Sequence, residues 1–257
     1  GFSGQAFQFN GQGDKIELND PPSLRLTNAF TIEAWILASN APAGGHAQIF
    51  FRGDMRGCFD PYYLSLQPNR AIRLHVGAED PLNPCGVDLE SPAITLNDWK
   101  HVAGVFDGDE GKMRIYIDGA LAAEMSTSVR PFANLDPSAN PGVAIGNHSR
   151  GFSDQGFTGL IDELAVYGRA LAANEIAAIY YAGSQGKCSN PNLPATNCVT
   201  APAGLLAWWS AESNSLDRIG ASVGSFAPAT YSVGKVGTAF DFNGANNVVV
   251  PDQPSFN

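Results

Sequence analysis

The chain has 257 residues, of which 44% are hydrophobic, and a formal net charge of −10 from 25 acidic and 15 basic residues. Such a chain can bury a sizeable core, and its acidic balance argues against a nucleic-acid-binding protein. No stretch reaches the ~18 consecutive apolar residues of a membrane-spanning helix, so no membrane span is expected in this segment. The 28 glycines and 17 prolines favour many short strands joined by turns.

Alternating apolar and polar residues predict strands in the first half of the chain. Residues 31–36 and 70–76 alternate, which places their apolar residues on the inner face of a sheet. In the second segment, Arg73 and His75 are then expected on the outer face. Residues 99–106 are almost continuously apolar, which is typical of a central strand.

The strand pattern continues through the middle of the chain. The acidic segment 107–111 lies where a hairpin turn belongs and does not match an EF-hand calcium loop. Residues 112–117 alternate and run into Asp118-Gly119, a dipeptide typical of tight hairpins because both central residues of the turn need positive φ. Residues 159–167 predict a further strand.

One helix is expected near the end of this strand-rich region. Residues 172–181 contain good helix formers with apolar residues at helical spacing, and Gly183 stands where a C-terminal cap belongs. Many short strands with one late helix indicate an all-β fold, an antiparallel β-sandwich with one short C-terminal helix.

The end of the chain repeats its beginning. Residues 234–257 match residues 1–24 at a shift of 233 positions. Eight pairs of residues are identical: Gly1/Gly234, Gly4/Gly237, Ala6/Ala239, Phe7/Phe240, Phe9/Phe242, Asn10/Asn243, Gly11/Gly244 and Pro21/Pro254. A long internal period indicates an array of domains, so we interpret the chain as an excerpt of a tandem array.

This period suggests three segments. Residues 1–187 are expected to form one sandwich that lacks its own opening strand. Residues 188–203 are rich in proline and asparagine and read as a linker. Residues 204–257 then contain the opening strands of a second copy, too short to fold as a sandwich alone.

The four cysteines fall into two local pairs, Cys58 with Cys85 and Cys188 with Cys198. Neither pair has the spacing of a zinc site, and each flanks a loop rich in proline, asparagine or glycine. Although four cysteines allow three pairings, this placement favours two local disulfides over cross-pairing or free thiols. Two disulfides predict an extracellular protein, secreted or at the cell surface.

Four segments together resemble laminin G-like (LamG-like) jelly-roll domains of the concanavalin A-like lectin/glucanase superfamily. These segments are 204–212 with 217–220, 234–244, 98–106 with 115–119, and 159–167 with 169–176. Their order along the chain matches the order in the family if the chain is treated as circular. The chain departs from the family where Ala172 replaces the usual Ser or Thr cap of the helix, although Glu175 keeps the other half of the capping box.

The resemblance also implies where the opening strand belongs. In this family it pairs near the closing strand, so residues 1–187 alone would leave an exposed sheet edge. We expect residues 204–216 to fill that edge by strand addition, either in the same chain or in a neighbouring copy. Within one chain, residues 234–257 are expected to compete with residues 1–24 for one place, which favours the neighbouring copy modestly.

The resemblance to this family implies one metal site. Family members often hold a calcium ion near the turn after their second strand, and the matching positions here are Asn10, Asp14 and Asp162. Asparagine and aspartate oxygens suit Ca²⁺. The alternative is that Asp162 accepts backbone hydrogen bonds near the end of the sheet.

No catalytic residues are predicted. Hydrolysis of a glycosidic bond usually needs two carboxylates that face one substrate, and Asp162 and Glu163, adjacent on a strand, are expected to point to opposite faces. His101 is expected to be structural, and Asn147 begins an N-glycosylation sequon.

The sequence therefore predicts a non-catalytic extracellular domain of a repeat protein. It would serve adhesion, structural spacing or the binding of a glycan or extracellular protein, with neighbouring copies as further partners. One alternative is a carbohydrate-binding module of a larger hydrolase. Another is a subunit of an extracellular filament that assembles by strand donation.

Overall fold

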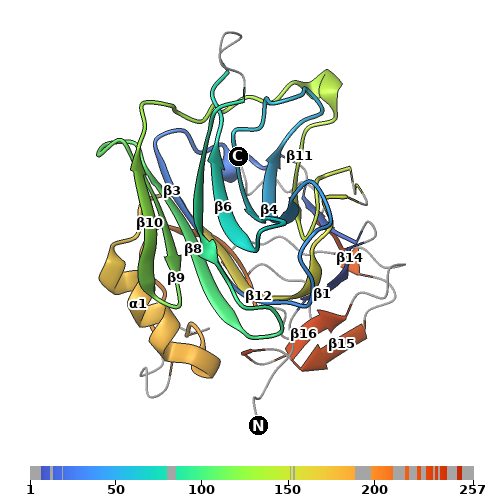
Figure 1. The fold of residues 1–257 in the computed structure, drawn as a ribbon, viewed down its shortest axis with the longest axis vertical. Helices are drawn as coiled ribbons and strands as arrows, with labels where there is room; N and C mark the ends of the chain where they lie inside the picture. The colour runs from blue at the N-terminus through green and yellow to red at the C-terminus, as the bar shows by residue number, and fades with distance from the viewer. Residues whose placement is uncertain are drawn as a thin grey trace.

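A computed structural model shows two sheets packed face to face, as expected for a β-sandwich (Figure 1). The structure describes residues 7–11, 14–18, 20–79, 85–150, 152, 154–188, 198–210, 218–219, 225–226, 230–233, 235–236, 238–241 and 248–250.

Among the described residues, the first sheet has nine strands. In spatial order, eight of them are β10 (Ala120–Ser126), β9 (Lys112–Ile117), β8 (Lys100–Asp107), β3 (Ala29–Ala38), β12 (Thr158–Tyr167), β1 (Phe7–Asn10), β16 (Thr238–Asp241) and β15 (Thr230–Val233). The ninth strand, β13 (Leu205–Trp209), also pairs with β12. The expected central strand, β8, lies between β9 and β3.

In the part of the chain that the structure describes, the second sheet has eight strands. Their spatial order is β14 (Ser225–Phe226), β17 (Val248–Val250), β2 (Ile16–Leu18), β11 (Gly142–Ile145), β4 (Ala47–Gly53), β5 (Tyr62–Leu66), β6 (Ala71–Val76) and β7 (Val87–Ala93). Short 3₁₀ turns within the described ranges connect strands or follow the helix: η1 (Pro22–Leu24), η2 (Pro137–Ala139) and η3 (Gly183–Gln185).

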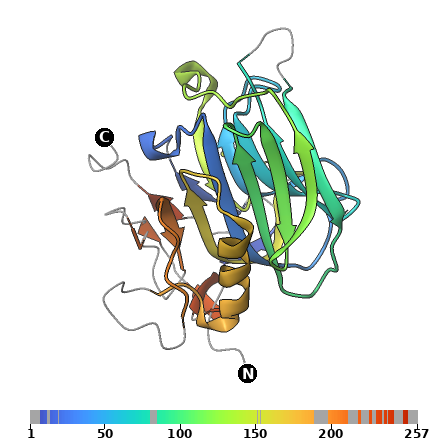
Figure 2. The same cartoon turned by 90° about the vertical axis from the view of Figure 1, so that its left-hand side faces the viewer.

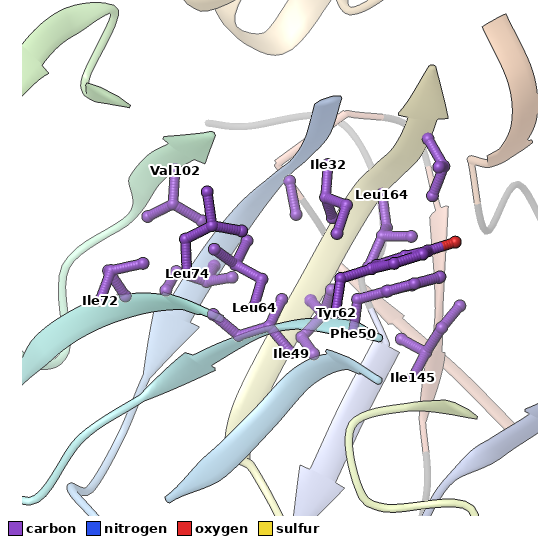
Figure 3. Close-up of a cluster of buried hydrophobic side chains, with 14 of the residues drawn as sticks. Ile32, Ile49, Phe50, Tyr62, Leu64, Ile72, Leu74, Val102, Ile145 and Leu164 are labelled. Atoms are coloured by element: carbon purple, nitrogen blue, oxygen red, sulfur yellow. The ribbon is translucent and has the colours of Figure 1, made fainter. Parts of the chain in front are cut away.

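The main core lies between the sheets and follows the predicted alternation (Figure 3). It contains Ile32, Ala34 and Ile36 of β3 together with Ile72, Leu74 and Val76 of β6. The hairpin between β9 and β10 turns at Asp118 and Gly119, which have φ values of 50° and 76°, so the dipeptide adopts the positive φ that its turn requires.

A second, smaller apolar cluster covers the outer face of the nine-stranded sheet. Helix α1 (Ala173–Ala182) packs there through Ile176 and Ile179, against residues of β8, β12 and β13 (Figure 2). The helix ends at Gly183 as predicted. The surviving half of its capping box forms, since the backbone N–H of Ala172 donates to Glu175 Oε2 at 2.9 Å.

The closing strand β12 has one edge that two distant segments share. Its first half pairs with β1, from Phe7 opposite Ile161 to Asn10 opposite Thr158. Its second half pairs with β13, where Trp209 lies opposite Leu164. The strand from the second half-copy thus completes this edge within the same chain.

The expected competition between the two copies does not occur in this structure. β16 lies parallel to β1, with Gln8 opposite Asp241, and β17 lies parallel to β2 along three residue pairs. Each repeated strand therefore lies beside its counterpart and has a place of its own in the sheet. Both sheets are extended by these added strands.

Candidate functional site

A pocket of about 390 Å³ opens on the outer face of the eight-stranded sheet, over β4 to β7. Its walls come from this sheet, from the loop between β4 and β5, and from the loop after β11. The residues that line it are His46, Asp54, Met55, Arg56, Gly57, Cys58, Asp60, Tyr63, His75, Cys85, Asp88, His148, Phe152 and Gln155.

Side chains in register across four strands form a row, and three of them, on β5, β6 and β7, line the floor of the pocket. Phe51 of β4 lies opposite Tyr63 of β5, Tyr63 opposite His75 of β6, and His75 opposite Asp88 of β7. Their apolar strand neighbours face the core, so this row belongs to the outer face. The Tyr63 and His75 rings stack with centroids 4.4 Å apart, and His46 stacks on Tyr63 at 5.2 Å.

The rim of the pocket is held by a disulfide. Cys58, in the loop after β4, is bonded to Cys85, immediately before β7. The same loop folds closely over β4, because a Cβ atom at Gly53 would lie 2.0 Å from Asp60 Oδ1. Asp60 is thereby fixed beside the pocket, and its Oδ1 has no hydrogen-bond partner among the described residues.

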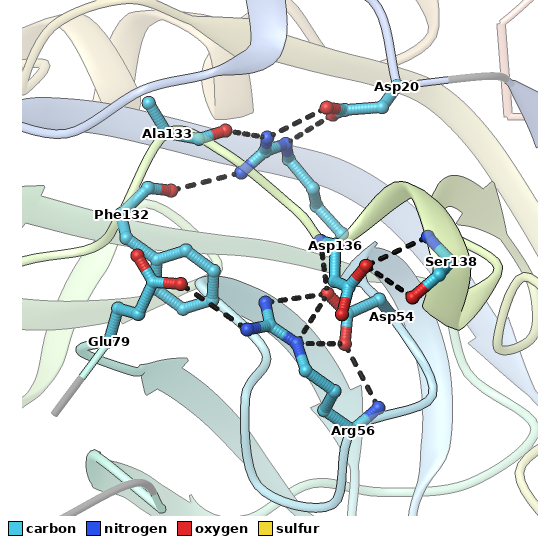
Figure 4. Close-up of polar contacts among 9 residues, drawn as sticks. Asp20, Asp54, Arg56, Glu79, Phe132, Ala133, Asp136 and Ser138 are labelled. Carbon is cyan, nitrogen blue, oxygen red and sulfur yellow. Dashed lines mark hydrogen bonds and ion pairs between the residues drawn. The ribbon is translucent and has the colours of Figure 1, made fainter. Parts of the chain in front are cut away.

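A second polar network supports the rim (Figure 4). The buried carboxylate of Asp54 accepts bonds from Arg56 Nη2 at 2.8 Å and from the backbone N–H of Asp136 at 2.9 Å. Arg56 also reaches Glu79 at 3.3 Å. Asp54 is therefore occupied as an anchor of the loop rather than free to meet a ligand.

Burial shifts the protonation of several groups at the pocket. Desolvation raises the pKa of Asp60 to about 7, and the nearby charge of Asp54 adds to this shift. Desolvation lowers the pKa of His148 to about 4 and also lowers the pKa of His46. Although desolvation opposes it, the hydrogen bond from His75, at 2.7 Å, helps lower the pKa of Asp88.

The structure brings together two of the three predicted calcium ligands. The backbone N–H of Asn10 donates to Asp14 Oδ2 at 3.0 Å, and burial raises the pKa of Asp14. Asp162 lies beyond the Phe7–Ile161 pair, about 13 Å along β12 from the residue opposite Asn10. Among the described residues, no group of three or more His, Cys, Asp or Glu could hold a metal ion.

Asp162 instead binds the backbone, as the alternative interpretation of this residue proposed. Its Oδ2 accepts N–H groups of Lys235 and Val236 at 2.6 and 2.8 Å. Burial and the charge of Glu163 raise the pKa of Asp162.

The expectation that Asp162 and Glu163 point to opposite faces is wrong. A register shift between Asp162 and Ala165 marks a bulge, and Glu163 has a φ of 55°. Both carboxylates therefore meet the segments that cover the sheet: Asp162 meets residues 235–236, and Glu163 accepts the indole N–H of Trp208 at 3.1 Å. Both side chains are buried, so neither meets a substrate.

Glu163 belongs to a buried ionic cluster on the outer face of the nine-stranded sheet, made of Glu33, His101, Glu163 and Lys187. Lys187 Nζ lies 2.9 Å from Glu33 Oε1 and 3.2 Å from Glu163 Oε2. His101 Nε2 lies 3.1 Å from Glu33 Oε2, which gives His101 the structural role expected of it. Burial opposes the charge on Lys187, but the two carboxylates raise its pKa.

Two other sequence features have clear positions. Cys188 and Cys198 form the second local disulfide, at the start of the linker. Asn147 of the sequon is fully buried, so its amide is not accessible for glycosylation in the folded chain. No described helix is long and apolar enough to cross a membrane.

The sequence alone did not identify the pocket. The only signal was the alternation that placed His75 on the outer face. That Tyr63 and Asp88 flank it depends on strand register, which is a property of the pairing and not of any one strand.

Comparison with known proteins agrees with the fold. A laminin G family model, described as concanavalin A-like lectin/glucanases superfamily, matches residues 10–177. This chain belongs to the concanavalin A-like lectin/glucanases superfamily. Among curated proteins, none matches the chain.

Several solved structures share this superfamily fold at low sequence identity. A proposed carbohydrate-binding protein from Bacteroides ovatus ATCC 8483 is 18% identical with a TM-score of 0.59; the match covers 87% of this chain and 54% of that protein. The chain thus spans about half the length of the Bacteroides protein.

Two further structures come from sialidases. The CBM40 of the Ruminococcus gnavus IT-sialidase, bound to α2,3-sialyllactose, is 18% identical with a TM-score of 0.52; the match covers 69% of this chain and 96% of the module. The leech intramolecular trans-sialidase, complexed with 2,7-anhydro-Neu5Ac, is 20% identical with a TM-score of 0.50; coverage is 60% of this chain and 23% of the enzyme. At these identities the matches concern the fold only.

Proposed function

We propose that this chain is a carbohydrate-binding domain without catalytic activity, and that it binds glycans in the pocket over β4 to β7. The observation that carries the proposal is one concave site whose lining combines the partly exposed rings of His46 and Phe152 with the exposed carboxylate of Asp88. Sugars are bound by apolar contact with rings and by hydrogen bonds from their hydroxyl groups to fixed acceptors. The pocket offers both.

The similar structures support this assignment of function. The Bacteroides ovatus protein is a proposed carbohydrate-binding protein, and the Ruminococcus gnavus module was solved with a bound oligosaccharide. Because superfolds of this kind host both binding modules and enzymes, the pocket rather than the fold is the main argument.

The absence of catalysis is part of the proposal. A glycosidase of the usual type needs two carboxylates about 5–9.5 Å apart that both reach the substrate. In the pocket, Asp54 is occupied by Arg56 and by the backbone, and Asp88 is bonded to His75. Asp60 alone then retains an unpartnered carboxyl oxygen among the described residues that line the pocket.

We further propose that the domain is extracellular and works as one unit of a repeat protein. The two disulfides favour an oxidising compartment. The repeat of residues 1–24 in residues 234–257 favours a tandem array, in which glycan binding would serve adhesion or attachment to a larger enzyme.

The binding test compares two aromatic residues on different faces. Phe152 lines the pocket, whereas Tyr181, on α1, is 82% exposed on the opposite side of the sandwich. We expect Phe152→Ala to weaken glycan binding by about tenfold, the equivalent of one lost ring contact, and Tyr181→Ala to leave it unchanged. A glycan array followed by calorimetry measures both, and equal effects of the two changes contradict the proposed site.

A second candidate function, assembly by strand donation, is favoured by the position of β13. Residues 205–209 begin the second half-copy, yet they complete the edge of β12 next to β1. In an array, each opening strand could in the same way join the closing strand of another copy.

Cysteines at the paired positions Val166 and Ala207 test this second candidate. Disulfide-linked dimers and longer species on a non-reducing gel are expected if strands are donated between chains. Cross-linked monomers alone contradict donation and leave β13 as a strand of its own sheet.

A further inference from the structure

The charges around the pocket define the class of sugar that it can take, an inference that rests on the proposed function. We infer that the pocket binds uncharged sugars and excludes glycans that end in a carboxylate. A glycan that ends in a carboxylate needs a cation that is free to pair with it.

Carboxylates outnumber cations in the lining. Asp54, Asp60 and Asp88 line the pocket, and Arg56 is the one Arg or Lys among the described lining residues. Arg56 is already shared by two acids, since its guanidinium lies 2.8 Å from Asp54 and 3.3 Å from Glu79. A ligand carboxylate would have to displace one of these partners.

The next cation along the sheet is held in the same way. Arg73 lies outside the lining, on the outer face beside His75. Its guanidinium lies 3.2 Å from Asp88 and 2.7 Å from Glu90. Like Arg56, it serves two carboxylates and has little remaining capacity for an anion.

Two histidines of the lining add no positive charge at neutral pH. Burial lowers the pKa of His46 and brings the pKa of His148 to about 4. The third, His75, is bonded to Asp88 at 2.7 Å. Near His148, Lys15 is bonded to Glu17 and to the backbone of Ser149, and the exposed Arg150 does not line the pocket.

The remaining polar groups suit hydroxyl donors. Asp60 Oδ1 is buried, whereas the Asp88 side chain is 39% exposed and lines the pocket. A sugar hydroxyl can donate to the Asp88 carboxylate, while a ligand carboxylate meets like charge there. The volume of about 390 Å³ lies near the lower end for ligand pockets, so one or two sugar units are expected.

The experiment uses the full chain and pairs of glycans that differ only in a terminal sialic acid, such as lactose and α2,3-sialyllactose. An array of such pairs is screened first, and calorimetry then measures both members of each pair that binds. We expect the neutral member to bind at least about tenfold more tightly, because the acid would approach more carboxylates than cations and both nearby arginines are already paired.

A charge-neutralising variant tests the cause of this selectivity. Asp88→Asn removes one carboxylate and frees Arg73 in part, so the preference for the neutral member should fall by about fivefold. Asp98→Asn, which makes the same chemical change at an exposed position paired with Lys100 and outside the pocket, should leave the preference unchanged.

The outcomes separate the inference from the proposed function. Equal or tighter binding of the sialylated member overturns the inference and leaves glycan binding intact. A preference that Asp98→Asn alters as much as Asp88→Asn also overturns it. Binding to none of the glycans overturns the proposed function itself.

Discussion

Histidine, carboxylate, cation and aromatic side chains gather on the outer faces of both sheets, and the two faces use them differently. On the nine-stranded sheet, Glu33, His101, Glu163 and Lys187 are sealed beneath α1 and the segment that carries Trp208. On the eight-stranded sheet, the row from Tyr63 to Asp88 lines a pocket between two loops, and the Asp88 side chain is 39% exposed there. Whether other segments cover such a face, and not which residue types it carries, decides whether the face stabilises the fold or can bind a ligand.

The two outer faces also differ in the partners of their charged groups. Within the ionic cluster, the one lysine contacts two carboxylates and the side chains are almost completely excluded from water. At the pocket, Asp60 and Asp88 retain contact with solvent. The charges of the buried ionic cluster therefore depend on one another for stabilisation. The exposed carboxylate at the pocket can instead exchange its bound water for a ligand.

The largest expected effect is at the sealed face. Lys187→Met leaves Glu33 and Glu163 buried without their cation, so unfolding should become easier by about 3–5 kcal/mol. Lys112→Met is the matched control, because Lys112 pairs with Glu124 at the surface and should cost at most about 1 kcal/mol. Denaturant unfolding measures both, and similar losses would show that the cluster adds nothing beyond a surface ion pair.

The next effect concerns the rim of the open face. Replacing Cys58 and Cys85 together by serine should lower stability by about 2–4 kcal/mol and weaken glycan binding, because the loop that carries Asp60 loses its tether. The same double change at Cys188 and Cys198 affects the linker, so it should lower stability without changing glycan affinity. Loss of binding in both variants would contradict a specific role of the first disulfide at the pocket.

A smaller effect is expected in the pH dependence of stability, through the carboxyl group of Asp60 at the pocket. Because burial raises the pKa of Asp60 from 3.8 to about 7, the folded chain binds this proton more tightly than the unfolded chain does. Stability contributed by the protonated carboxyl is therefore lost as pH rises from about 4 to about 7.

Asp60→Asn should remove that loss. At pH 8 we expect the variant to be more stable by about 1–3 kcal/mol, less than the full shift implies because the side chain keeps some access to solvent. Unfolding curves at several pH values measure this, and parallel profiles for the two proteins would exclude Asp60 as the titrating group.

The smallest expected effect is that of calcium, which stays a prediction. Asn10 and Asp14 lie next to each other, while the third predicted ligand, Asp162, binds the backbone of residues 235–236. We expect calcium to raise the melting temperature slightly relative to chelator, and Asp14→Asn to abolish the difference. Identical melting temperatures for the unmodified chain in both conditions would remove the site.

Local pattern was sufficient for much of the fold. Alternation in residues 31–36 and 70–76 determined which side chains enter the core, since successive residues on a strand face opposite ways. The Asp118-Gly119 turn follows from its positive φ values, and the helix followed by Gly183 from helical spacing and capping. Each of these features depends on residues close together in the sequence.

The tertiary structure decided what depends on distant neighbours. Only strand pairing places Tyr63, His75 and Asp88 in one row, and only the loops over them make that row a pocket. The bulge at Glu163 breaks the alternation on which the sequence argument relied, and the shared edge of β12 lets β1 and β13 join one sheet. Register, cover and edge sharing are properties of several segments together, so no single stretch of this sequence contains them.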